Sequence, residues 1–293
     1  ITTLIASGPV VIDGEQDRVI SGLHISNPNG TCIDIKNGSS NITIKDSEIG
    51  PCGDNGIQIV GSSNVTVYNN YIHDTGTEGV WSYESDNIAV DSNVIIDVRS
   101  GYDMWTTTKG NLSFTNNFVK NVHKESNGVS GPGDNGGGNI VNINFVRGGG
   151  IRVTDNVGIN IAGQSSTEDL INIYKSYGSA ADPILVVRNR FNGGGPSTSG
   201  GGIILGDQEG TYQLVEDNIL VNPGQYGLAI AGGQNNTLRN NQVYSDDQRA
   251  FTNVGLYVWR FDSENDGTKP GQCYNHTVEL NQVTWWQGPD HDG

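Results

Sequence analysis

The stretch Asn64-Val-Thr-Val-Tyr-Asn-Asn-Tyr-Ile72 decides the fold, because its pattern returns along most of the chain. Apolar, mostly β-branched residues alternate with polar ones, and a pair of polar turn residues then interrupts the alternation. The same pattern occupies residues 41–49, 87–95 and 111–119. Alternation of this kind predicts short half-buried β-strands, and the Asn pairs predict the turns between them.

The pattern recurs with a short and nearly constant period. Its second turn residue falls at Ser47, Asn70, Asn93, Asn117, Asn156, Asn189, Asp217, Asn241 and Asn281. Four of the eight intervals are 23 or 24 residues long, which is typical of a solenoid whose units bury their apolar faces against each other. We therefore predict an all-β fold, a single-stranded parallel β-helix of about ten turns with Asn ladders in its turns. One domain would cover residues 1–293, with the repeats between about 15 and 285.

Composition excludes several classes of function. The chain has 293 residues, 34% of them hydrophobic, and 32 acidic against 16 basic side chains give a net charge of −16. That apolar content is enough for a folded core. A strongly negative surface repels phosphates, so we expect no nucleic-acid partner. No run of about 18 apolar residues occurs, so we expect no membrane partner. We also expect a monomer.

Two features bear on the cellular compartment. Seven Asn-Xaa-Ser/Thr sequons, together with the acidity and few lysines, favour a secreted protein, although the repeat itself also places Asn before β-branched strands. The sequons begin at Asn29, Asn37, Asn41, Asn64, Asn111, Asn235 and Asn275. Cys32 and Cys52 could form a disulfide bond between neighbouring segments, which would leave Cys273 unpaired.

Intervals longer than 24 residues mark insertions. They are rich in Gly, Ser, Asp and Asn, and lie at residues 120–138, 162–169, 176–182, 193–201, 245–253 and 262–272. Solenoids concentrate insertions on one binding face, so these loops are expected to border a cleft.

One strand of each repeat, the strand that follows a glycine such as Gly79 or Gly101, carries outward aromatic and polar residues. Aligned across the repeats, the first outward position of this strand holds Gln58, Trp81, Asp103, Asn144, Asn172, Ile204, Ala229 and Tyr257. The second outward position holds the aromatic residues Tyr83, Trp105, Tyr174 and Trp259. Aromatic faces stack on sugar rings, while amides and carboxylates bind hydroxyl groups. We predict a polysaccharide partner held by Trp81, Tyr83, Asp103, Trp105, Asn144, Asn172, Tyr257, Trp259 and Arg260. The alternative is that the tryptophans pack under the inserted loops.

The same alignment places Arg147, Lys175 and Asp207 in one column at the strand ends. Cleavage of a uronic-acid polymer by β-elimination needs a base, a proton donor and a cation for the carboxylate. A neighbouring cation would favour the neutral, basic form of Lys175. Tyr174 would then deliver the proton and Arg147 would bind the carboxylate. In the alternative, Asp207 merely pairs with Lys175 on the surface.

An acidic protein must bind an acidic polymer locally, and a Ca²⁺ cofactor would allow this. Hard cations take carboxylate and carbonyl oxygens, which makes Glu168 and Asp169 the candidate metal ligands, with Asn144 and Asn172 close by.

The repeats, from about residue 15 to 285, resemble the large pectate-lyase-like superfamily of right-handed β-helices. The resemblance implies a right-handed coil and activity on polysaccharides. The segment Glu168-Asp-Leu-Ile-Asn-Ile-Tyr-Lys-Ser176 is similar to a strand of the alginate lyase and chondroitinase B family, which implies Glu168 as calcium ligand and Lys175 as base. That family has a second acid where Leu170 stands and an arginine where this chain has Gly206 and Asp207.

These features lead to three hypotheses of function. We predict a secreted polysaccharide lyase. The first alternative is a glycoside hydrolase that uses two of the outward carboxylates Glu84, Asp103 and Asp207. The second alternative is a non-catalytic β-helix that binds glycans or forms extracellular fibres.

Overall fold

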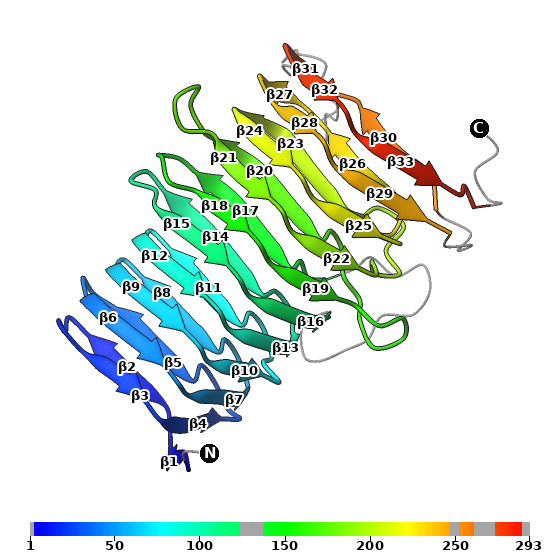
Figure 1. Ribbon diagram of the computed structural model, residues 1–293. Coiled ribbons are helices and arrows are strands. Elements are labelled where there is room, and N and C mark those ends of the chain that lie inside the picture. Colours follow the sequence, from blue (N-terminus) through cyan, green and yellow to red (C-terminus); the bar gives the residue numbers. More distant parts are fainter. Residues whose placement is uncertain (1–2, 124–136, 247–251, 261–272, 289–293) are drawn as a thin grey trace.

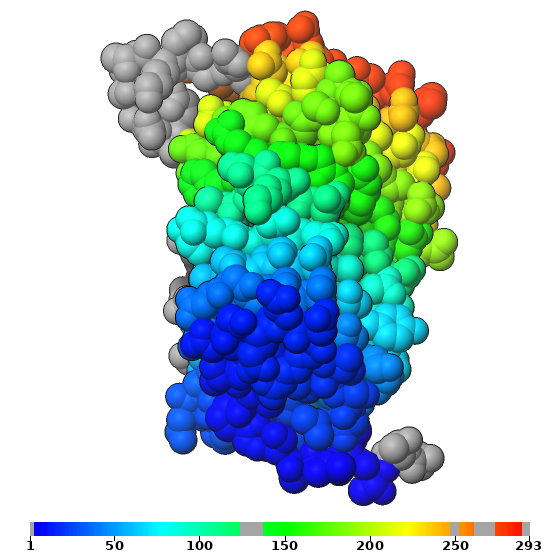
Figure 2. Space-filling view, turned by 90° about the vertical axis from the view of Figure 1, so that its left-hand side faces the viewer, coloured from blue at the N-terminus to red at the C-terminus, as the bar shows by residue number. Residues whose placement is uncertain are grey.

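A computed structural model describes residues 3–123, 137–246, 252–260 and 273–288. The strands stack as successive coils of one elongated solenoid, with the first coils at one end and the last at the other (Figures 1 and 2). All strand pairs are parallel and join segments one repeat apart, as in the register of β8 and β11. The predicted all-β parallel β-helix is therefore confirmed. Within the described ranges, no helix is long and apolar enough to cross a membrane.

Each coil contributes one strand to each of three sheets. Sheet A contains β1 (Ile5–Ser7), β4 (Leu23–Asn27), β7 (Glu48–Cys52), β10 (Tyr71–His73), β13 (Val94–Val98), β16 (Phe118–Val122), β19 (Val157–Ile159), β22 (Arg190–Asn192), β25 (Ile219–Val221), β29 (Gln242–Ser245) and β33 (Gln282–Trp285). Sheet B contains β2 (Val10–Asp13), β5 (Ile33–Lys36), β8 (Ile57–Val60), β11 (Val80–Tyr83), β14 (Tyr102–Thr107), β17 (Val141–Val146), β20 (Ile171–Tyr177), β23 (Ile203–Thr211), β26 (Tyr226–Ile230) and β30 (Val254–Val258), with β27 (Gly233–Gln234) and β31 (Cys273–Tyr274) attached. Sheet C contains β3 (Val19–Ser21), β6 (Ser40–Lys45), β9 (Ser63–Tyr68), β12 (Asp86–Asp91), β15 (Leu112–Thr115), β18 (Arg152–Thr154), β21 (Ile184–Val187), β24 (Gln213–Glu216), β28 (Thr237–Arg239) and β32 (Thr277–Glu279).

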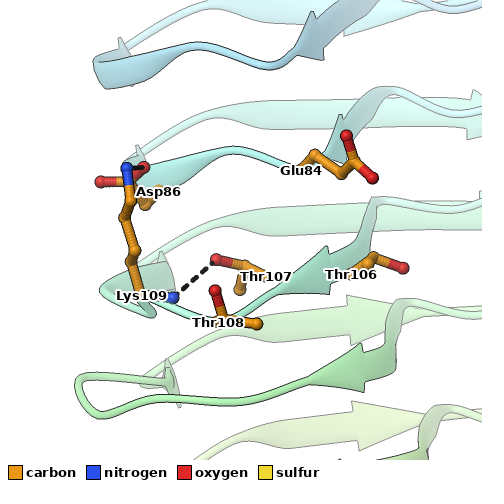
Figure 3. A pocket seen from close by; sticks show the side chains of 6 residues that line it. All are labelled: Glu84, Asp86, Thr106, Thr107, Thr108 and Lys109. Atoms are coloured by element: carbon orange, nitrogen blue, oxygen red, sulfur yellow. Dashed lines mark hydrogen bonds and ion pairs between the residues drawn. The ribbon is translucent and has the colours of Figure 1, made fainter.

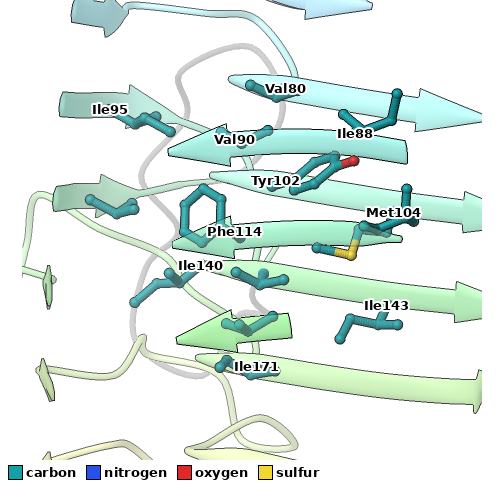
Figure 4. Packing of buried hydrophobic residues seen from close by; sticks show 14 of the residues in the cluster. Val80, Ile88, Val90, Ile95, Tyr102, Met104, Phe114, Ile140, Ile143 and Ile171 are labelled. Atoms are coloured by element: carbon teal, nitrogen blue, oxygen red, sulfur yellow. The ribbon is translucent and has the colours of Figure 1, made fainter. Parts of the chain in front are cut away.

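The core is a set of columns in which equivalent side chains of successive coils pack on each other. In sheet B, Ile57, Val80 and Tyr102 lie in register and all three are fully buried. Figure 4 shows Tyr102 and Met104 packed in the interior beside Phe114. Because side chains of a strand alternate between its two faces, the residues between these columns point outward.

A ladder of buried asparagines supports the turn between sheets C and A. The Nδ2 of Asn93 donates to Oδ1 of Asn117 at 3.0 Å, and Asn117 donates in the same way to Asn156 at 3.2 Å. The ladder comprises Asn70, Asn93, Asn117, Asn156, Asn189, Asn218, Asn241 and Asn281. The predicted ladder is confirmed, with one correction. Asn218, not Asp217, is the ladder residue, because an amide both donates and accepts along the column whereas a carboxylate only accepts.

Four of the six predicted insertions lie at one corner of the coil, whereas 176–182 follows sheet B and leads to sheet C. The segments between β16 and β17, β19 and β20, β22 and β23, and β29 and β30 all join sheet A to sheet B. The predicted loops 162–169 and 193–201 lie at this corner, whereas 262–272 and parts of 120–138 and 245–253 lie outside the described residues. Residues 176–177 of the loop predicted at 176–182 still belong to β20. The A–B corner therefore borders one side of the outward face of sheet B.

The cysteines behave as anticipated. Cys32 and Cys52 form a disulfide bond, and Cys273 is free.

Candidate functional site

The outward face of sheet B carries a groove of about 590 Å³ along β8, β11, β14 and β17. The strand register places Gln58, Trp81, Asp103 and Asn142 side by side on consecutive coils. The groove is lined by Asp54, Asn55, Gln58, Thr77, Glu78, Trp81, Tyr83, Arg99, Asp103, Trp105 and Asn142. Four of the predicted binding residues, Trp81, Tyr83, Asp103 and Trp105, thus lie together in one groove.

The aromatic side chains form part of the groove floor. Trp81 and Tyr83 stack with ring centroids 5.8 Å apart and 17° between their planes. Trp105 lies opposite Tyr83 on the next coil. All three rings remain partly exposed, so they are not buried under loops. Their exposed parts offer apolar surface to a sugar ring.

Asp103 is a buried carboxyl group at the centre of this groove. It is only 4% exposed. Burial and the negative charge of Glu78 raise the pKa of Asp103 to about 7, against hydrogen bonds from Trp105 and Asn144. Asn144 Nδ2 donates to its Oδ1 at 3.0 Å. Near neutral pH, Asp103 can therefore hold a proton and give it up.

Glu78 lies beside Asp103 in a different environment. It precedes β11 at the A–B corner, and its side chain is 8% exposed. Arg99 Nη1 donates to Glu78 Oε1 at 2.6 Å, forming an ion pair inside the groove wall. The site thus combines one carboxyl group that is easily protonated with one that is paired with a cation. Such a pair suits acid–base chemistry.

The structure corrects the sequence alignment at β17. Val141, not Ile143, lies opposite Tyr102, so the strand is shifted by two residues. Asn142 consequently occupies the first outward column between Asp103 and Asn172. Asn144 lies in the second column, opposite Trp105, where it contacts Asp103.

The same shift separates Arg147 from Lys175. Arg147 pairs with Tyr177 and places its guanidinium 4.2 Å from the centre of that ring. Two residues of strand correspond to about 7 Å. The prediction that Arg147, Lys175 and Asp207 share one column is therefore wrong. Asp207 does come near Lys175, because it lies opposite Tyr174 and the positive charge of Lys175 acts on it.

Lys175 lies at a sharp corner of the coil. Its φ of 43° is left-handed, as are those of Glu84, Thr106 and Gln208 at the equivalent corner of other coils. Its Nζ is 5.2 Å from the ring centre of Tyr174. The left-handed conformation interrupts the inward–outward alternation of side chains, so the alignment could not place the Lys175 side chain correctly.

A second polar network lies two coils beyond Asp103. Asn172 Nδ2 donates to Asp169 at 3.1 Å and to Asp207 at 2.9 Å, and the Tyr226 hydroxyl donates to Asp169. Burial raises the pKa of Asp169 to about 7 and also raises that of Asp207. Tyr174 borders this network, so three of the four predicted catalytic residues lie near it and Arg147 does not.

Hydrogen bonds occupy Asp169, one of the two predicted calcium ligands, whereas Oε2 of the other, Glu168, is buried and accepts no hydrogen bond from any described residue, so calcium binding stays a prediction. Asp169 already accepts hydrogen bonds from the Gly201 amide at 2.9 Å, from Tyr226 and from Asn172, and Glu168 Oε1 accepts one from Ser199 at 2.6 Å. Donors directed at these oxygens compete with a metal for the same lone pairs. Among the described residues, no three His, Cys, Asp or Glu side chains converge to hold a metal ion.

Glu84 is not a partner of Asp103, contrary to the hydrolase alternative. It lines a separate hollow of about 260 Å³ at the corner between sheets B and C, with Asp86 and residues 106–109 (Figure 3). Lys109 Nζ lies 3.3 Å from Asp86 Oδ1 in this hollow. The hollow has no aromatic lining, so we assign the site to the groove.

The remaining predicted residues lie at the far end of the face. Tyr257 packs edge-on against Tyr226 with ring centroids 5.4 Å apart. Trp259 is 63% exposed, and Arg260 is exposed beside it. None of the three lines the groove.

Sequence reasoning missed Glu78, Arg99, Asp54 and Asn142. Glu78 stands two residues before the first inward residue of its strand, a position also held by Asn55 and Asp169. Reading that column across the repeats would have found it.

A family model describing a right-handed β-helix region matches residues 6–173, and the chain belongs to this family. The predicted right-handed coil and the superfamily resemblance are thereby confirmed. Comparison with curated proteins finds no significant match.

Similar solved structures include catalytic domains of a GH87 alpha-1,3-glucanase. An aspartate-to-alanine variant in complex with tetrasaccharides has a TM-score of 0.64 and 15% sequence identity, covering 99% of this chain and 60% of that one. A complex with nigerose has a TM-score of 0.63 and 14% identity, covering 97% and 56%. Alginate lyase from Paenibacillus sp. str. FPU-7 has a TM-score of 0.42 and 10% identity, covering 95% and 99%. The likeness to the glucanase is one of fold, and this chain spans about 60% of that neighbour's length.

Proposed function

We propose that the protein is a glycoside hydrolase that cleaves a neutral polysaccharide in the groove of sheet B. One observation carries the proposal. The groove brings an aromatic floor together with two adjacent carboxyl groups, Asp103 and Glu78, whose surroundings differ. Hydrolysis of a glycosidic bond needs such a pair.

The roles follow from the surroundings of each group. Asp103, with a pKa of about 7, donates its proton to the glycosidic oxygen as the bond to the anomeric carbon breaks. Glu78, which forms an ion pair with Arg99, takes a proton from the water that adds to that carbon. The products are two shorter chains, and the proton passes from Glu78 back to Asp103 through solvent.

The charge of the groove favours a neutral substrate. Asp54 and Glu78 line it, together with Asp103 once that group ionises, against one cation, Arg99, and the whole chain carries a net charge of −16. A uronic-acid polymer would meet repulsion along this face. The lyase hypothesis also needs Arg147 beside Lys175, which the register does not provide. Because the similar solved structures are of an alpha-1,3-glucanase, α-1,3-glucan is the first substrate to test.

We place this activity outside the cytosol and in a monomer. The Cys32–Cys52 disulfide supports an oxidising compartment. The acidic surface supports a protein that stays dispersed in solution.

The test is a panel of α-1,3-glucan, other neutral glucans, alginate and polygalacturonate, each incubated with and without a chelator. We expect new reducing ends from a neutral glucan, no ultraviolet absorbance from unsaturated uronates, and no effect of the chelator. Asp103→Asn and Glu78→Gln should lose activity, whereas Asp155→Asn, which alters a carboxylate paired with Arg188, should keep it. Ultraviolet-absorbing products from alginate or polygalacturonate would refute the hydrolase.

A further inference from the structure

The outward face of sheet B changes character between β20 and β26. In β8 and β11, buried inward residues alternate with half-exposed outward ones. In β26 all five residues are buried. The outward residue Ala229 is 0% exposed, and Ile204, in register with it on β23, is 9% exposed.

These outward residues belong to a small apolar cluster separate from the coil interior. Ile204, Tyr226, Ala229 and Ala231 form the cluster, with Val254 and Tyr257 packed against it. The cluster stands on the same column that forms the groove floor, since Asn172 lies opposite Ile204. A polysaccharide that follows this column from β8 therefore meets buried apolar side chains on β23 and β26, where the column offers no exposed floor.

The last half-exposed positions before the cluster are polar. Asn172 donates to both Asp169 and Asp207, and the hydroxyl of Tyr226 fixes Asp169 from the side of the cluster. Asn172 and Asp207 are both half-buried, and Oδ1 of Asn172 is itself buried. A partly exposed carboxylate such as that of Asp207 can accept hydrogen bonds from sugar hydroxyl groups.

We infer that the groove is closed at its C-terminal end and that the protein takes a polysaccharide by a chain end. The terminal sugar lies over Asn172, donates hydroxyl hydrogen bonds to Asp207 and stops at the apolar cluster of Ile204 and Tyr257. Asp103 and Asn172 are two strands apart, which is about 10 Å or the length of a disaccharide. If the proposed function holds, cleavage at Asp103 releases short products of one size, and this part of the inference rests on that function.

Thiol labelling tests the closed end without any substrate. In a Cys273→Ser background, Ala229→Cys and Gln58→Cys place a thiol at the closed and the open part of one column. We expect a small thiol reagent to label Ala229→Cys at least about ten-fold more slowly than Gln58→Cys. Ala231→Cys serves as the second buried position if the first variant does not fold. Equal labelling of the buried and open positions would overturn the closed end.

Product analysis tests the consequence for catalysis. On α-1,3-glucan, we expect one short oligosaccharide from the earliest time point, and longer products from Tyr257→Ala. An early mixture of long fragments from the wild type would overturn chain-end binding. Failure to cleave any glucan, with Ala229→Cys still unreactive, would instead refute the proposed hydrolase and uphold the closed end.

Discussion

Replacing Asp103 by Asn should abolish activity and at the same time stabilise the protein at alkaline pH. The pKa of Asp103 is raised from 3.8 to about 7 because the folded chain buries it beside Glu78. Between these values the folded state keeps a proton that the unfolded chain has released. The folded state of the wild type therefore loses stability as the pH rises from about 4 through about 7. An amide cannot ionise, so the variant escapes this loss.

The size of the effect follows from the displacement of the pKa. A difference of about three pH units, at 1.36 kcal/mol each, is about 4 kcal/mol. We expect Asp103→Asn to raise the unfolding free energy at pH 8 by about 2–4 kcal/mol. The gain falls short of the full value because the introduced amide oxygen accepts well from only one of the two donors, Asn144 and Trp105. Urea unfolding followed by tryptophan fluorescence at pH 8 and at pH 4 measures both ends of the curve. Loss of the general acid should lower kcat by about 10²–10⁴-fold.

The sign of the stability change is the decisive result. A variant that is no more stable than wild type at pH 8, or equally more stable at pH 4, would refute the burial argument. Asp155→Asn is the matched control. A hydrogen bond from Arg188 lowers the pKa of Asp155, so removing that carboxylate should weaken the protein at pH 8 instead.

Four further outcomes follow from the same geometry. Wild-type activity should fall as the pH rises through about 7, where Asp103 loses its proton; a rate that keeps rising to pH 9 would contradict its role as acid. Trp81→Ala should raise KM with little effect on the unfolding midpoint, because the ring is partly exposed on the groove floor; an unchanged KM would remove it from the binding surface. Arg99→Ala leaves buried Glu78 unpaired and should lower the unfolding free energy by about 3–5 kcal/mol. The double variant Arg99→Ala/Glu78→Gln should recover part of that stability. Asn156→Ala interrupts the ladder and should lower stability by about 2–4 kcal/mol while substrate affinity stays unchanged below the melting temperature.

The fold could be predicted from the sequence because the same pattern of strands and turns recurs in most coils. Alternating β-branched residues fix which side chains enter the core, and the Asn column fixes the turn between sheets C and A. Each coil then constrains the next through strand pairing. Where the repeat is regular, as from Gln58 through Trp81 to Asp103, the predicted register is the observed one.

The register was predicted wrongly where the repeat is interrupted. The long segment before β17 removes the fixed spacing, and the apolar pattern of Ile143 and Val141 fits two alignments equally well. Left-handed residues at the strand ends, such as Phe145 and Lys175, add a second irregularity that alternation does not encode. Both errors fall on the predicted lyase pair, whereas the aromatic part of the site precedes the interruption.

The pairing of Asp103 with Glu78 was not predicted, because only Asp103 lies on a strand. Asp103 follows from alternation, but Glu78 stands at the A–B corner, where the chain enters sheet B and no two-residue period applies. Stacking explains why such a corner can supply a catalytic group. The corners of consecutive coils lie about 4.8 Å apart. Stacking therefore brings together a carboxylate at one corner, a cation at the following corner and a buried acid on the adjoining strand. These groups interact electrostatically without any packing of long loops. Glu78, Arg99 and Asp103 occupy those three positions on two consecutive coils. The register that builds the core thereby also sets the pKa of the acid, and a slip of one coil against the next would abolish both.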